Sequence, residues 1–126
     1  MMLFTFKAPT LLEPEAIPNA NEFIHDEPKE TSERLAKIKK FVHWLKAEMD
    51  ENGLSTKGLV LDPSGWVFEV PCDEGFVMCI VANLDGDEAC IRLLVTEMGG
   101  APEGGDRAVE ALLRRSSKIA ELKVEQ

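Results

Sequence analysis

The sequence predicts an α+β fold: a meandering antiparallel sheet of four or more strands, packed by a long N-terminal helix and a shorter C-terminal helix and preceded by a Pro-rich extended arm. Apolar residues recur every three to four positions over 31–52, alternate in short segments over 57–96, and return to helical spacing after 105. The 126 residues are predicted to form one domain, with the arm over 1–30 and the α+β core over 31–126.

The arm is predicted from its prolines. Four of the seven prolines precede the first helix, at Pro9, Pro14, Pro18 and Pro28. Proline removes a backbone donor and disfavours helix just before itself, so an extended chain is expected over 9–26, after a short strand over 3–6. The apolar Phe23 and Ile24 indicate that the arm lies along the domain or a neighbouring subunit.

The first helix is predicted to begin at about Thr31 and to end at Asn52-Gly53, where glycine permits a left-handed stop. Its apolar face consists of Leu35, Ile38, Val42, Leu45 and Met49. These positions follow the three- and four-residue steps of an amphipathic helix.

Three turns divide the central segment into four strands. Asp62-Pro63-Ser64-Gly65 matches a type I turn and places Leu61 opposite Trp66. Asp73-Glu74-Gly75 is predicted as a three-residue loop, and Asp85-Gly86 as a two-residue turn. These closures fix which side chains share a face, because a slip of one residue reverses every side chain of a strand.

With these registers, both faces of the sheet are rich in apolar side chains. The predicted core face carries Leu59, Leu61, Trp66, Phe68, Val70, Phe76, Met78, Ile80, Ala82, Ile91, Leu93 and Val95. The second face carries Val60, Val67, Glu69, Val77, Cys79, Val81, Cys90, Arg92 and Leu94. The second face is too apolar for open solvent, so we expect the arm, the second helix or another chain to cover part of it.

A glycine-rich linker over 98–106 precedes the second helix, for which Asp106 is the expected N-cap. The linker lacks the lysine of a phosphate-binding loop, and its carboxylates, Glu103 and Asp106, would repel an anion. The alternation over 119–124 favours a final strand over continued helix.

The net charge of −9 comes from 23 acidic against 14 basic residues. Such a surface repels phosphate backbones and anionic lipid, which argues against nucleic acid or membrane as partner and favours another protein, in particular a basic one. No apolar run reaches the roughly 20 residues that span a bilayer. The odd number of cysteines and the lack of a secretory signal predict a cytoplasmic protein with free thiols.

The three cysteines are candidates for metal or redox chemistry. No Cys-x-x-Cys pair exists, and His25 and His43 fall in the arm and the first helix, so neither a metal site nor a cofactor is predicted. The thiols are interpreted as small packed side chains.

Glu69, Cys79 and Arg92 form the most specific polar feature, because the predicted registers place them side by side on three strands of the second face. A carboxylate and a guanidinium embedded in apolar sheet are expected to pair across the cysteine, and this row is either a structural ion pair or part of a binding surface. The acidic turn residues Asp85, Asp87 and Glu88 complete the candidate binding set.

We therefore expect a non-enzymatic, acidic protein-binding module, since no serine or thiol lies in a motif that pairs it with a base. Its most concrete form is an immunity-type inhibitor that neutralises a basic partner such as a toxin. The order helix, meander, helix also occurs in immunity proteins and secretion chaperones. The alternatives are a homodimeric secretion chaperone or adaptor, and a small-molecule-binding domain or enzyme with a pocket near Glu69, Cys79 and Arg92.

Overall fold

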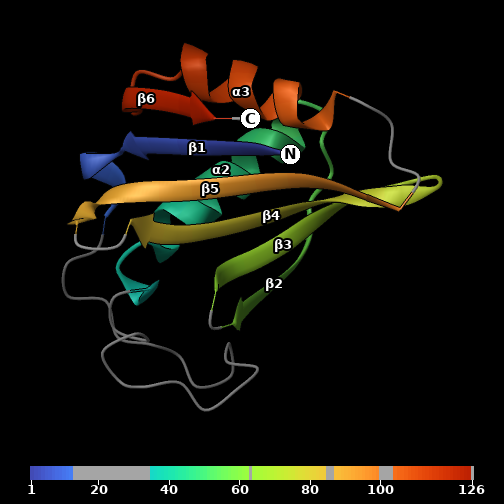
Figure 1. Ribbon diagram of the computed structural model, residues 1–126, viewed down its shortest axis with the longest axis horizontal. Coiled ribbons are helices and arrows are strands. Elements are labelled where there is room, and N and C mark those ends of the chain that lie inside the picture. The colour runs from blue at the N-terminus through green and yellow to red at the C-terminus, as the bar shows by residue number, and fades with distance from the viewer. Residues whose placement is uncertain (13–34, 63, 85–86, 100–103, 126) are drawn as a thin grey trace.

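The computed structural model describes residues 1–12, 35–62, 64–84, 87–99 and 104–125. These form an α+β structure with a six-stranded antiparallel sheet and two α-helices (Figure 1). In chain order the elements are β1 (Met2–Lys7), the 3-10 turn η1 (Pro9–Leu11), α2 (Lys39–Glu51), β2 (Lys57–Asp62), β3 (Gly65–Cys72), β4 (Gly75–Leu84), β5 (Asp87–Gly99), α3 (Gly105–Arg115) and β6 (Ala120–Glu125). The predicted arm lies mostly outside the described residues.

The strands lie in the order β2-β3-β4-β5-β1-β6. The meander of β2 to β5 confirms the prediction, and so does the final strand β6. The N-terminal strand β1 fits between β5 and β6, because its alternation buries Phe4 and Phe6 while Thr5 points to the other face. This pairing joins the two ends of the chain in one sheet.

The two helices are of similar length, with 13 residues in α2 and 11 in α3. The expected start of the first helix at about Thr31 lies outside the described residues; Leu35 and Ala36 are helical, a turn follows at 37–38, and α2 begins at Lys39. Its end is as predicted: Gly53 has a φ of +83°, and the backbone N–H of Leu54 donates to the carbonyl of Met49 at 2.9 Å.

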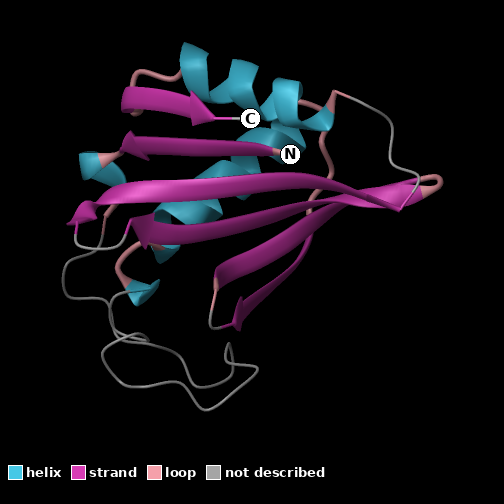
Figure 2. Ribbon diagram, in the orientation of Figure 1, coloured by secondary structure: helices cyan, strands magenta, loops and turns pink. Residues whose placement is uncertain are grey.

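Both helices pack on the same face of the sheet, which we call the covered face (Figure 2). Phe41, Val42, Leu45 and Met49 of α2 and Val109, Leu112 and Leu113 of α3 are buried in one core with the strands. Trp66 anchors this core, because its side chain is 1% exposed and its indole N–H donates to the carbonyl of Leu35 at 2.8 Å.

The side chains of β4 point to the opposite faces of the sheet from those predicted. Cys72 pairs with Gly75, so the loop after β3 is the two-residue turn 73–74 and not the predicted three-residue loop. At the next turn Leu84 pairs with Asp87 as expected, but an irregularity beside it places Cys79 opposite Val95, where Arg92 was predicted.

The pairing of β3 with β4 and the pairing of β4 with β5 are both shifted from the predicted register by an odd number of residues. An odd shift moves the side chains of the next strand to the opposite face of the sheet. The two reversals cancel for β5, and only β4 is inverted: Val77, Cys79 and Val81 point into the core, while Met78 and Ile80 point away. The sequence of β4 is apolar at both sets of positions, so its pattern alone does not distinguish the two registers.

Neither α2 nor α3 is long and apolar enough to cross a membrane, and this holds for the part of the chain that the structure describes.

Candidate protein interface

The sheet face opposite the helices, which we call the open face, carries a continuous row of apolar side chains. Figure 1 shows this face toward the viewer, with α2 behind it. The observed registers align Val60, Val67, Ile80, Leu94 and Leu3 across five neighbouring strands. Val60 is 41% exposed and the other four are half-buried. The row is therefore a hydrophobic stripe that the described helices leave uncovered.

A shallow hollow of about 240 Å³ lies on this stripe. It is lined by Leu3, Ser64, Ile80, Ala82, Arg92 and Leu94. The volume is below the roughly 300–1,000 Å³ of a typical small-molecule site. A hollow of this size on an open sheet can accept one or two side chains of a partner.

The predicted row of Glu69, Cys79 and Arg92 is not formed. Cys79 lies on the covered face, fully buried beneath the helices, while Glu69 and Arg92 lie half-buried on the open face. The predicted pairing of the carboxylate and the guanidinium across the cysteine is therefore wrong, and so is the placing of Cys79 on that face. The pocket required by the small-molecule alternative is not assembled from these three residues.

Burial also determines the chemistry of Cys79. Loss of hydration raises the pKa of its thiol from 9.0 to about 12, because the thiolate is penalised inside the core. A neutral, buried thiol is a poor nucleophile and a poor metal ligand. The interpretation of this residue as a small packed side chain agrees with its surroundings.

Glu69 and Arg92 are instead arranged diagonally about the centre of the open face. Glu69 follows Val67 by two residues on β3, and Arg92 precedes Leu94 by two residues on β5, on opposite sides of the apolar row. With strands about 4.8 Å apart and about 3.4 Å per residue, their Cα atoms are separated by about 17 Å. They are two separate charges on the surface.

The other predicted binding residues lie at the turn between β4 and β5. Asp85 is outside the described residues. The backbone of Asp87 pairs with Leu84 at the beginning of β5, and Glu88 follows it in that strand, but their side chains are outside the description. Their role in binding stays a prediction.

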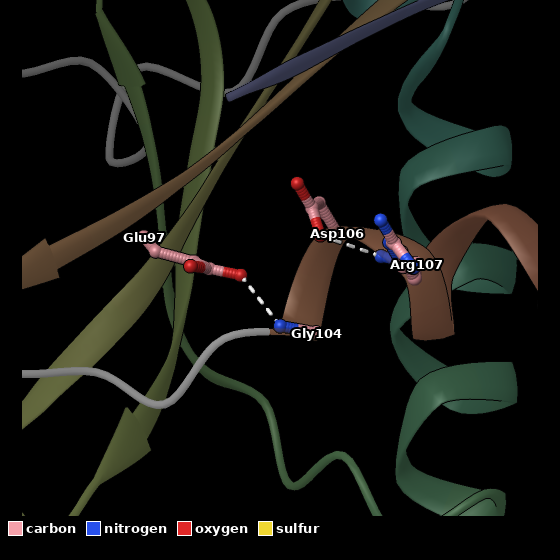
Figure 3. A pocket seen from close by; sticks show the side chains of 4 residues that line it. All are labelled: Glu97, Gly104, Asp106 and Arg107. Carbon is pink, nitrogen blue, oxygen red and sulfur yellow. Dashed lines mark hydrogen bonds between the residues drawn. The ribbon is translucent and has the colours of Figure 1, made fainter. Parts of the chain in front are cut away.

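A second hollow, of about 410 Å³, lies at the N-terminus of α3 and shows a contact that was not predicted (Figure 3). The carboxylate of Glu97 accepts hydrogen bonds from the backbone N–H groups of Gly104 and Gly105, at 3.0 and 3.2 Å. The N-cap is Gly104 and not Asp106, whose carboxylate accepts from the N–H of Arg107 at 2.8 Å. Glu97 therefore occupies the position that an anion would take.

The sequence contained a signal for this cap. Ile91, Leu93 and Val95 alternate toward the core, and Glu97 is the next position on that face. A carboxylate that follows three buried positions needs donors, since a partly buried charge without hydrogen bonds is costly. Close packing requires a glycine beside it, because a Cβ on Gly105 would lie 2.8 Å from the side chain of Val77.

No cluster of three or more His, Cys, Asp or Glu side chains suited to a metal ion occurs among the described residues. His43 is exposed on α2, whereas His25 falls outside the description. The chain matched no family model, no curated protein and no solved structure when it was compared with each.

Proposed function

We propose that the chain is a protein-binding module without a reaction of its own, and that the open face is its interaction surface. The observation that carries this proposal is the apolar row of Val60, Val67, Ile80, Leu94 and Leu3 across five strands. When one face of a sheet lies in water, the side chains on that face are normally polar. A contiguous apolar stripe on such a face is typical of a surface that binds another protein.

The placement of charge on the open face supports a protein partner over a small molecule. The Cα atoms of Glu69 and Arg92 are about 17 Å apart by the spacing of strands and residues, and only Arg92 lines the hollow on the stripe, so the two residues do not share one pocket. An apolar centre with charged side chains toward its edge is instead the composition of protein interfaces, where arginine is enriched.

The experiment places a photoreactive benzoyl-phenylalanine at Val60, the most exposed member of the row, and in a matched variant at His43, which is exposed on α2. After irradiation of expressing cells, the Val60 variant should give a discrete protein adduct that the His43 variant lacks. Mass spectrometry of the adduct identifies what lies on the open face. Adducts at neither position, or the same adducts at both, would contradict the proposal.

A second candidate is the immunity-type inhibitor of a basic protein, which is favoured by the net charge of −9. The described open face carries Glu69 but also Arg92 and Lys57, so the acidic excess would act through other surfaces. Association with a basic toxin encoded beside this chain should slow steeply between 50 and 500 mM NaCl, because salt screens charge steering beyond about 10 Å. An association rate that does not change with salt would contradict this candidate.

A further inference from the structure

Glu69 and Arg92, two of the charged residues on the open face, are related to one another by the geometry of the sheet. Ile80 lies on β4, between β3 with Glu69 and β5 with Arg92. Met78, opposite Glu69, is two residues from Ile80 in one direction, and Ala82, opposite Arg92, is two residues away in the other. Ile80 is therefore the midpoint of the line from Glu69 to Arg92. A two-fold axis that lies in the face, passes Ile80 and is perpendicular to this line exchanges the two positions.

We propose that the open face is covered by a second copy of this chain, packed face to face about this axis, so that Glu69 of each copy pairs with Arg92 of the other. The proposal rests on the proposed function, since it requires that the open face binds protein, and it names the partner. The apolar rows of the two copies cross at Ile80 and bury one another. The helices then lie on the two outer sides of the dimer.

The geometry of packed sheets permits this arrangement. When the axis exchanges the positions of Glu69 and Arg92, the strands of the two copies cross at about 70°. This angle is calculated from a spacing of about 4.8 Å between strands and about 3.4 Å per residue along them. This crossing angle is nearer to the orthogonal class of sheet packing than to the aligned class. Facing sheets lie about 10 Å apart, which a glutamate and an arginine side chain extending from opposite sides span together.

The size of the face is close to what a dimer needs. Six strands at about 4.8 Å give a width of about 29 Å, and seven residues at about 3.4 Å give a length of about 24 Å, so the projected area is on the order of 700 Å² per copy. Stable interfaces bury about 800 Å² of accessible surface on each partner. The accessible area of a face with protruding side chains exceeds its projection, so the two values are comparable.

Charge complementarity favours a second copy over an unrelated partner. Among the described residues, neither Glu69 nor Arg92 takes part in an ion pair. A different protein would have to present an opposite charge to each of them, at the correct separation. A second copy supplies both charges by symmetry, and a two-fold interface is self-complementary in this way.

The test is sedimentation equilibrium of the full chain over a range of concentrations. The wild type should reach twice its chain mass of 14.0 kDa. Glu69→Arg and Arg92→Glu, made singly, should each raise the dissociation constant of the dimer at least tenfold. Each single variant brings residues 69 and 92 together with the same charge at both of the symmetry-related contacts. The double variant with both changes should recover most of the wild-type affinity, a rescue that a purely structural role of either residue would not give.

Two further variants complete the design. Ile80→Glu places a carboxylate at the axis and should leave a folded monomer, with its fold checked by thermal melting. Lys40→Glu, at an exposed position of α2, makes the same charge change as Arg92→Glu on the other side of the molecule and should leave the dimer unchanged.

A wild type that stays monomeric, or a dimer that none of the open-face variants weakens, would overturn this inference. If the chain is monomeric and the probe at Val60 attaches to a different protein, the inference fails while the proposed function stands. If the probe attaches within the same chain, this chain's own residues cover the face and the inference also fails. A monomer that gives no adduct at Val60 overturns both proposals.

Discussion

Leu93 and Leu94 are neighbours on β5 with the same side chain, yet Leu93 is completely buried and Leu94 is half-buried on the open face. The same contrast holds on β4 between Val81 and Ile80. The two faces of the sheet therefore have similar apolar composition and differ in what lies on them. Four buried positions of α2 and three of α3 cover one face, and neither of these two helices lies on the other.

We propose that hydrophobicity serves two purposes in this sheet. On the covered face it stabilises the monomer, since each buried apolar side chain contributes about 1.5–3 kcal/mol. On the open face the same side chains contribute less to folding and are available for an interface. The two roles can be separated by experiment, because neighbouring residues on one strand belong to different faces.

The largest expected effect separates the two leucines of β5. Leu93→Ala should lower the free energy of unfolding by about 2–5 kcal/mol, the usual cost of a cavity in a packed core. Leu94→Ala should cost less than about 1 kcal/mol at concentrations where the chain is monomeric, because its neighbourhood is already open to water. Urea denaturation of both variants measures the difference, and equal losses would show that the open face is packed within the monomer.

A smaller effect is expected at the edge of the covered face, where Glu97 caps α3. Glu97→Ala should cost about 1–2 kcal/mol, because two backbone N–H groups lose their acceptor at the positive end of the helix. Asp106→Ala is the matched control, and its loss should be about 0.3–1 kcal/mol, since its carboxylate contacts only the N–H of Arg107. Thermal melts of both variants show which one loses more stability. A larger loss of stability for Asp106→Ala would assign the cap to that residue.

The smallest effect concerns the thiol of Cys79. In a variant with Cys72→Ser and Cys90→Ser, this thiol should react with Ellman's reagent at pH 8 only after unfolding in urea, because burial raises its pKa to about 12. The folded chain keeps a proton that the unfolded chain loses above about pH 9, so this group lowers stability as the pH rises from 9.0 toward 12. A fast reaction of the native protein would place Cys79 at the surface.

Much of the fold could be predicted from local signals. The predicted pairing of Leu61 with Trp66 was correct, as were the stop at Asn52-Gly53 and the final strand. These features depend on turn chemistry and on the period of apolar residues within a few positions. The candidate site was predicted less well. Glu69 and Arg92 were placed on the correct face, but their row with Cys79 depended on two hairpin registers, and both were wrong.

The sequence by itself determined that the chain forms a meander of strands with apolar side chains on both sides and an amphipathic helix to cover one of them. It also determined the charges that the open face carries, because Glu69 and Arg92 keep the same face when β3 and β5 are read from their own alternation. Only the tertiary structure decided which side chains of β4 meet the helices, and therefore that Ile80 lies between those two charges. The physical reason is that turns differing in length by one residue have similar local chemistry. The length of the turn nevertheless decides which side chains of the next strand pack against α2 and α3.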